Sequence, residues 1–184
     1  MQVEPPTYRS QCLSVRGDEW FALWLPLNHP IGMSVLRGEK PYEGAFVGNT
    51  HHFAVRVYFE DTDVGGVVYH ANYLRFLERA RSDLLRAAGI EQRAAIQNGQ
   101  GVYAVVELHI KYCKPARLED DLVIISHLQE VRGVSSVIGQ KILRGEDMLV
   151  EATVTVAFLG SNGRPKRQPA EWVQKLQRIL SKPD

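Results

Sequence analysis

The chain has 184 residues, of which 45% are hydrophobic, which is enough for one domain with a buried core and short for two. Lys and Arg number 22 and Asp and Glu number 21, so the net charge of +1 argues against nucleic acid or an anionic membrane surface as a partner. No apolar run approaches the roughly 20 residues of a membrane-spanning helix, so no integral membrane segment is predicted.

Residues 1–50 predict an N-terminal extension outside the folded domain, because prolines and glycines interrupt them and no apolar periodicity is sustained. No basic segment and small-residue cleavage site frame the apolar stretch near Trp20, which argues against a signal peptide. The two cysteines, Cys12 and Cys113, lack metal-ligand spacing and offer at most one disulfide. We therefore expect a cytoplasmic protein without a metal site, with secretion as the alternative.

The remaining elements follow from the spacing of apolar residues. Residues 53–59 alternate apolar and polar side chains, which predicts a half-buried strand. A helical stripe then predicts a long helix from Tyr73 to Ala88, ended by Gly89, and a short helix at 90–98. Four more strands are predicted at residues 102–112, 122–128, 134–143 and 149–158. Five antiparallel strands curling over one long helix make an α+β domain at residues 51–168, and residues 169–184 predict a C-terminal helix that packs on it.

The segment between the first predicted strand and the long helix concentrates groups that can do chemistry. Three carboxylates, Glu60, Asp61 and Asp63, precede the pair Gly65–Gly66, and His70 stands at the start of the helix. A carboxylate here would face free N–H groups and the positive end of the helix dipole, which stabilise developing negative charge. Asp beside glycine also commonly forms Asx turns or helix caps, so a structural role for Asp63 is the alternative.

The same residues resemble a known family. The run Tyr58–Tyr73, followed by Glu78–Arg81, Tyr112–Asp121 and Val131–Ser135, is similar to hotdog-fold acyl-CoA thioesterases of the 4-hydroxybenzoyl-CoA thioesterase type, closest to the bacterial branch associated with the Tol-Pal system. The resemblance covers roughly residues 52–167. It implies a hotdog fold, cofactor-free hydrolysis of acyl-CoA to acid and thiol, acyl carrier protein thioesters as a second candidate substrate, and a homodimer or homotetramer.

The resemblance also implies a set of site residues. It assigns the nucleophile or general base to Asp63, and it places His70 where either its ring orients Asp63 or its backbone N–H polarises the thioester oxygen. The predicted substrate-binding residues are Gly66, Val68, Tyr69, Tyr73 and, for the coenzyme A phosphates, Arg132. Lys111, Lys114 and Arg117 are the alternative phosphate ligands. Glu78 is an alternative base, although ion pairing with neighbouring arginines on the helix is its more common role.

Two other functions stay open at this stage. A hotdog binding module could hold acyl carrier protein or lipid-synthesis enzymes with weak turnover. Hydration or dehydration of an acyl thioester is a third option, but an acid that precedes the histidine fits hydrolysis better. The sequence does not fix the length of the acyl chain, its aromatic or aliphatic character, or whether Asp63 attacks directly or activates water.

Overall fold

The structure is a computed structural model that describes residues 42–181. Most of the predicted N-terminal extension, including Cys12 and Trp20, and the last three residues of the predicted C-terminal helix lie outside the described residues. No helix among the described residues is both long enough and apolar enough to cross a membrane.

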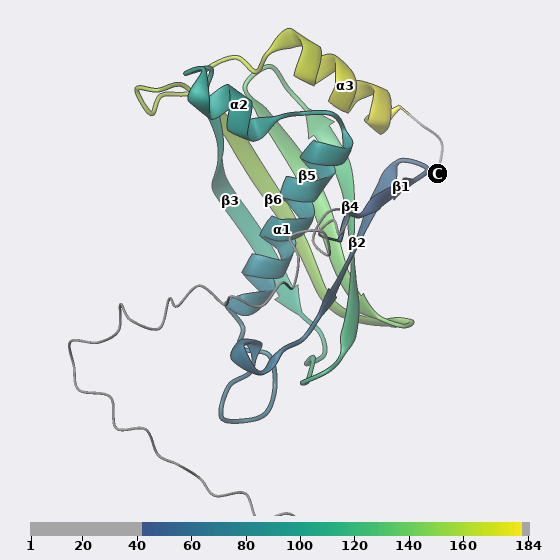
Figure 1. Cartoon of the computed structure of the whole chain (residues 1–184). Coiled ribbons are helices and arrows are strands. Elements are labelled where there is room, and N and C mark those ends of the chain that lie inside the picture. The colour runs from purple at the N-terminus through teal and green to yellow at the C-terminus, as the bar shows by residue number, and fades with distance from the viewer. Residues whose placement is uncertain (1–41, 182–184) are drawn as a thin grey trace, which may run out of the picture. The chain divides into compact units, whose positions relative to one another are not determined.

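One antiparallel sheet wraps around a long helix (Figure 1). Its six strands lie in the order β1–β2–β4–β5–β6–β3. The strands are β1 Ala45–Val47, β2 Thr50–Arg56, β3 Val102–Tyr112, β4 Asp121–Val131, β5 Ser135–Arg144 and β6 Asp147–Leu159. The helices are the 3-10 turn η1 Phe59–Asp61, α1 Asn72–Ala87, α2 Gln92–Gln97 and α3 Ala170–Leu180. The α+β class and the four strands after α2 are confirmed.

The prediction of five strands falls short by one. The sixth strand, β1, pairs with β2 through a two-residue turn at Gly48–Asn49, where Gly48 has a φ of 60°. Three residues are too short to show a period, but a glycine–asparagine pair before a strand is a hairpin signal that was open to sequence reasoning. Strand β1 lies inside the segment that we assigned to the extension.

The long helix buries the apolar stripe that its sequence predicts. Tyr73, Phe76, Leu77, Ala80 and Leu84 are at most 3% exposed, and they pack on the inner face of the sheet. The helix ends as predicted, because Gly89 has a φ of 71° and its N–H donates to the Arg86 carbonyl while the Ile90 N–H donates to the Leu85 carbonyl.

The first long strand ends earlier than its alternation suggests. Val57 is buried as expected, but Phe59 is 81% exposed because the chain leaves the sheet after Arg56 and turns into η1. The predicted C-terminal bound of this strand, residue 59, is therefore wrong. This early turn is what places the acidic loop at the N-terminus of α1 and not at the end of a straight strand.

The C-terminal helix covers the far end of the sheet from that loop, as Figure 1 shows. Trp172, Leu176 and Ile179 are buried, and the Trp172 ring stacks on Tyr103 with the centroids 6.0 Å apart. The Tyr103 hydroxyl donates to the side chain of Gln168 just before the helix. The predicted packing role of this helix agrees with these contacts.

A buried polar pair fastens the β1–β2 hairpin to α1. His51 Nε2 lies 3.0 Å from Asp83 Oδ2, and the same oxygen accepts the Gly44 N–H at 2.8 Å. Arg86 contacts the other oxygen of Asp83 at 3.0 Å. Burial lowers the pKa of His51 below its ordinary 6.5, and the neighbouring Asp83 opposes this shift.

This pair predicts a pH dependence of stability. Because the unfolded chain binds the His51 proton more tightly than the folded chain does, the contribution of His51 is complete above its unfolded pKa of 6.5 and declines as the pH falls toward the lower folded pKa. We expect the free energy of unfolding in urea to fall between about pH 7.5 and about pH 5.5. His51→Gln should flatten this slope, whereas His109→Gln, at a side chain that is 75% exposed, should not. An unchanged slope in His51→Gln would contradict the assignment.

Candidate functional site

A depression of about 280 Å³ opens at the N-terminus of α1. It is lined by Val68, His70, Tyr73, Tyr112, Cys113, Lys114 and Pro115. The cavity beneath the middle of α1, next to Arg81, encloses only about 50 Å³, far less than the depression. A hollow of about 680 Å³ lies at the other end of α1, along α2, but it gathers none of the predicted site residues. The depression at the N-terminus is therefore the candidate site.

Asp63 is on a tight hairpin that leads to this depression. Thr62 and Val68 form an antiparallel bridge, and the Asp63 N–H donates to the Val67 carbonyl at 2.9 Å. The Gly65 N–H donates to Asp63 Oδ1 at 2.7 Å, which is an Asx turn. Gly66 has a φ of 72°, which explains a glycine there. The exposed carboxylate keeps its second oxygen without a hydrogen-bond partner among the described residues.

Asp61 has a structural role. Its side chain is buried, and its carboxylate accepts the Tyr58 N–H at 2.9 Å. Its carbonyl accepts two further bonds, from the Tyr69 N–H at 2.9 Å and from the Asn72 side-chain amide at 2.9 Å. Asp61 therefore joins η1 to the start of α1, while Glu60 is exposed. Sequence reasoning had not singled out Asn72.

His70 is exposed at the rim of the depression, between two tyrosine rings. Its ring centroid is 4.4 Å from that of Tyr69 and 6.5 Å from that of Tyr112. The Tyr112 hydroxyl donates to the His70 carbonyl at 3.1 Å. Within residues 42–181, no hydrogen bond or ion pair joins the His70 ring to the Asp63 carboxylate. The residue at the helix N-cap is Ala71, and no side chain caps the helix there.

Two backbone amides just before α1 are free of hydrogen bonds within the described chain. The Asn72 N–H donates to the Tyr69 carbonyl at 2.8 Å, and the Leu74 N–H donates to the Ala71 carbonyl at 3.2 Å. The N–H groups of His70 and Ala71 donate no hydrogen bond to any described residue. Free amides at the positive end of a 16-residue helix can bind an oxygen that gains negative charge.

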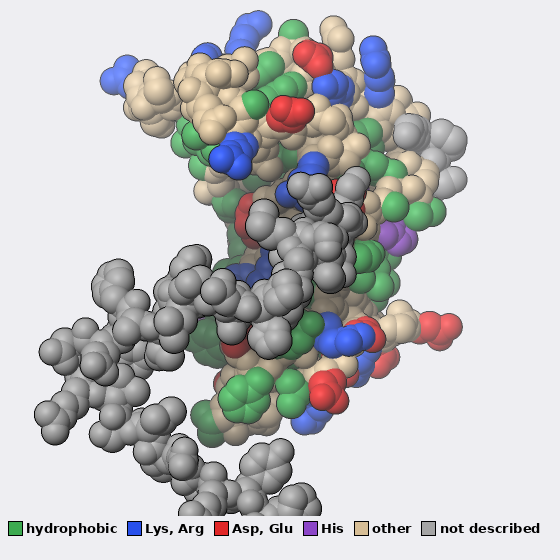
Figure 2. Space-filling view, in the orientation of Figure 1, with side chains coloured by type: hydrophobic (Ala, Val, Ile, Leu, Met, Phe, Trp, Pro, Cys, Tyr) green, Lys and Arg blue, Asp and Glu red, His purple; other side chains and the backbone are tan. Residues whose placement is uncertain are grey.

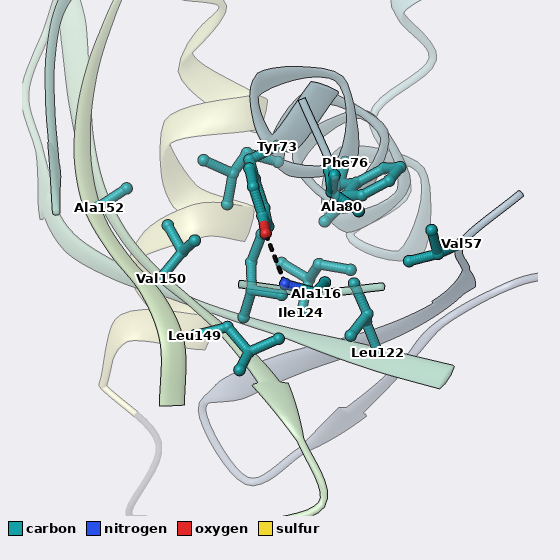
Figure 3. Packing of buried hydrophobic residues seen from close by; sticks show 13 residues of the cluster. Val57, Tyr73, Phe76, Ala80, Ala116, Leu122, Ile124, Leu149, Val150 and Ala152 are labelled. Atoms are coloured by element: carbon teal, nitrogen blue, oxygen red, sulfur yellow. Dashed lines mark hydrogen bonds between the residues drawn. The ribbon is translucent and has the colours of Figure 1, made fainter. Parts of the chain in front are cut away.

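Tyr73 lines the depression and is hydrogen-bonded to the loop that contains Ala116. Its side chain is buried, and its hydroxyl oxygen accepts the Ala116 N–H at 2.8 Å inside the core cluster drawn in Figure 3. The Val68 N–H donates to the Ala116 carbonyl at 2.9 Å. Burial raises the pKa of Tyr73 above 10.0, so the ring stays neutral.

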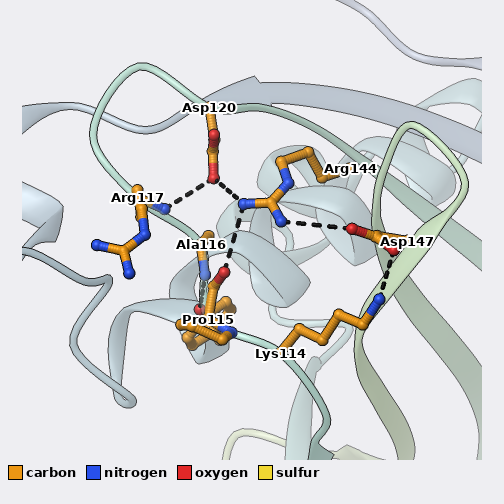
Figure 4. A network of polar contacts seen from close by, with 8 residues as sticks. Lys114, Pro115, Ala116, Arg117, Asp120, Arg144 and Asp147 are labelled. Carbon is orange, nitrogen blue, oxygen red and sulfur yellow. Dashed lines mark hydrogen bonds and ion pairs between the residues drawn. The ribbon is translucent and has the colours of Figure 1, made fainter.

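Cations and carboxylates alternate beside the depression (Figure 4). Lys114 contacts Asp147 at 2.5 Å, and Arg144 lies between Asp120 at 2.8 Å and Asp147 at 3.5 Å. Figure 4 shows the side chain of Arg117 directed away from Asp120, and it forms no ion pair within the described part of the chain. Lys114 lines the depression, and Arg144 donates to the carbonyl of the lining residue Pro115 at 3.5 Å.

Arg132 is not brought to this site within one chain. It follows the end of β4, whereas Asp121 at the start of β4 directly follows Asp120 of the cation network. Eleven strand residues span roughly 35 Å. Arg132 forms an ion pair with Glu130, and its carbonyl accepts a hydrogen bond from the Gln168 side chain at 2.6 Å.

Charge on the described surface is mixed, as expected from the composition. In the view of Figure 2, basic and acidic side chains are interspersed and neither sign forms a large patch. On α1, Glu78 pairs with Arg81 and accepts the Ser82 hydroxyl at 3.2 Å, which matches the ion-pair interpretation of this carboxylate.

Comparison with known proteins identifies the family. The model of the thioesterase superfamily matches residues 65–151. The acyl-CoA thioesterase YbgC of Haemophilus influenzae is 45% identical over 109 residues, which cover 59% of this chain and 80% of that protein. The acyl-CoA thioester hydrolase YbgC of Escherichia coli is also 45% identical, over 103 residues that cover 55% of this chain and 76% of that protein. The chain belongs to the thioesterase superfamily.

Solved structures agree with this membership. A probable thioesterase from Bartonella henselae is 37% identical and superposes with a TM-score of 0.62, covering 65% of this chain and 99% of that one. The sheet wrapped around α1 is therefore the hotdog fold of the superfamily, as the resemblance implied. The superfamily match begins at Gly65, so it includes the glycine turn, His70 and the whole of α1.

The thioesterase fold gathers most, though not all, of the predicted site residues. Val68, His70 and Tyr73 line the depression, and Asp63, Gly66 and Tyr69 lie on the hairpin and linker beside it. Arg132 follows the far end of β4 and does not line the depression. Tyr112 lines the site and was missed, because a contact between residues 42 positions apart leaves no local pattern in the sequence.

Proposed function

We propose that the chain hydrolyses acyl-CoA thioesters to free acid and thiol at the depression beside the N-terminus of α1. The observation that carries the proposal is the pair of free amides, His70 and Ala71, at the start of a long helix, together with the exposed Asp63 carboxylate on the hairpin that leads into that helix. The names of the YbgC relatives support the substrate class. Acyl carrier protein thioesters are a second candidate substrate.

Asp63 supplies the nucleophile or the general base in this proposal. Either its free oxygen attacks the thioester carbonyl and forms a mixed anhydride that water then opens, or it removes a proton from a water molecule that attacks. In both routes the C–S bond breaks, the coenzyme A thiolate leaves and takes up a proton, and water supplies the second oxygen of the acid. The amides of His70 and Ala71 hold the carbonyl oxygen while it is negatively charged.

The lining of the site suggests how the substrate is held. Val68 and Tyr73 line the depression and offer apolar surface for the acyl group, and the exposed ring of Tyr69 adds to it beside the hairpin turn at Gly66. Lys114 lines the depression and Arg117 lies two residues beyond the lining residue Pro115, so both suit the phosphates of coenzyme A. No cofactor or metal is required by this chemistry.

We further propose that the chain works as a homodimer or homotetramer in the cytoplasm. Within residues 42–181, strand β3 is an 11-residue sheet edge that pairs only with β6, and Val105 and Val106 on it are 48% and 59% exposed. A long uncovered edge favours pairing with a second strand. Antiparallel pairing of two β3 edges would bring the sheet end that carries Arg132 in one copy toward the depression of the other. Arg132 could then reach coenzyme A phosphates.

A panel of acyl-CoA substrates tests the proposal. We expect release of free thiol from aliphatic acyl-CoA of graded chain length and from an aromatic acyl-CoA, with a clear maximum at one class. The same panel on acyl carrier protein separates the two carriers. Absence of thiol release from every substrate, together with stable binding of acyl carrier protein, would replace the enzyme with a binding module.

A further inference from the structure

We infer that Arg144 is a positioning residue that holds one wall of the depression, residues 113–115, in the shape that binds the phosphates of coenzyme A, an inference that rests on the proposed function. Arg144 is the last residue of β5. Its guanidinium donates to the Asp120 carboxylate at 2.8 Å and to the carbonyl of the lining residue Pro115 at 3.5 Å (Figure 4). One side chain thus joins the β5–β6 hairpin to the loop between β3 and β4.

The loop between β3 and β4 contains a strained turn. Glu119 has a φ of 66°, and it is the only described residue other than glycine with a positive φ. A side chain in this left-handed conformation costs free energy, so the turn persists only where other contacts stabilise it. Asp120 supplies one of them, because its Oδ2 accepts the Arg117 N–H at 2.8 Å. The same oxygen accepts the bond from Arg144, so the guanidinium fixes the carboxylate that closes the turn.

Arg144 also acts on Lys114, the cation that lines the depression. Lys114 Nζ lies 2.5 Å from one oxygen of Asp147, and Arg144 Nη2 lies 3.5 Å from the other. Lys114, and then Arg144, lower the pKa of Asp147, so this carboxylate stays ionised at neutral pH. The hairpin that carries Arg144 and Asp147 therefore holds the ammonium group to which the proposed function assigns the phosphates.

The contacts on the core side of this wall do not involve Arg144. The Ala116 N–H donates to the Tyr73 hydroxyl at 2.8 Å, and the Ala116 carbonyl accepts the Val68 N–H at 2.9 Å. Both bonds remain when Arg144 is replaced, so the apolar surface at Val68 and Tyr73 should keep its shape. The effect of replacing Arg144 should therefore depend on the phosphates of the substrate and not on its acyl group.

The experiment measures kcat and KM of the full chain on two thioesters of the same acyl group, one of coenzyme A and one of pantetheine, which carries no phosphate. We expect Arg144→Gln to raise KM for the acyl-CoA on the order of tenfold, because binding is weakened equally in the ground state and the transition state. Its kcat on acyl-CoA, and kcat/KM on acyl-pantetheine, should stay within about twofold of the wild type. Arg144→Lys keeps the charge without the fork of donors, so its KM should be intermediate.

Two further variants separate positioning from stability. Arg56→Gln breaks another Arg–Asp pair, Nε to Asp121 Oδ1 at 2.7 Å, which is exposed and lies between β2 and β4. It should leave both thioesters unaffected. Asp120→Asn weakens the Arg144 contact from its other side. If the two residues act through one contact, the double variant should raise KM by less than the product of the two single effects.

Three results would overturn the inference. They are an unchanged KM for acyl-CoA in Arg144→Gln, an equal loss on both thioesters together with a lower thermal midpoint, and single effects that multiply in the double variant. Arg144→Lys carries the same comparison if Arg144→Gln does not fold. A wild-type chain that releases no thiol from either thioester would instead refute the proposed function, so the two failures are distinguished.

Discussion

Replacing Asp63 with Asn is expected to lower kcat on acyl-CoA by about a hundredfold or more while KM changes little. The amide keeps the shape of the carboxylate and can still accept the Gly65 N–H through its oxygen, so the Asx turn survives. It cannot attack a carbonyl or remove a proton from water. Steady-state release of thiol by the folded variant measures the effect.

Two further variants are compared with Asp63→Asn. Glu60→Gln makes the same chemical change at an exposed carboxylate three positions away, and it should leave kcat within about twofold of the wild type. His70→Ala should reduce kcat less than Asp63→Asn if the His70 backbone N–H is the group that meets the substrate. Near-normal turnover in a folded Asp63→Asn protein would remove Asp63 from the mechanism and leave its Asx turn as its whole role.

Phe76→Ala is expected to destabilise the fold by about 3–5 kcal/mol. Phe76 is fully buried between α1 and the sheet, and its ring meets Tyr73 with the centroids 6.2 Å apart. Truncation removes apolar area from the centre of the core and leaves a cavity that the surrounding strands cannot fill. A thermal midpoint lower by on the order of 10 °C should follow.

The control for this change lies on the same helix. Leu74 is 38% exposed, so Leu74→Ala should alter the free energy of unfolding by well under half as much. Equal losses in both variants would mean that the exposed side of α1 is buried against another chain, which would itself favour the proposed oligomer.

The sequence determined those parts of the protein that depend on neighbouring residues. The stripe from Tyr73 to Leu84 and the left-handed Gly89 define where α1 lies and ends, because burial of one helical face and a positive φ are local requirements. The alternation in residues 102–112 defines β3 for the same reason. The thioesterase motif around Asp63 and His70 was also recognisable, since the residues that form it are contiguous.

Other features were beyond a reading of local pattern. The local pattern does not show that the Asp61 side chain is buried, with its carboxylate bonded to the Tyr58 N–H, while the Asp63 side chain is exposed. The difference arises because β2 ends at Arg56 and the chain turns through η1, which places the two carboxylates in different environments. Strand β1 is signalled locally only by the Gly48–Asn49 turn, and its stability depends on its partner strand and on the contact of Gly44 with Asp83.

Only the tertiary structure decided which distant residues complete the site. Tyr112 meets the His70 carbonyl, and Ala116 meets Tyr73, across 42 and 43 positions of sequence, while Arg132 is held at the opposite end of β4. Such pairings depend on strand order and register, which are set by the packing of the whole sheet on α1. Local sequence specifies an element through its own backbone and side chains, but a contact between elements requires all of them to be in place.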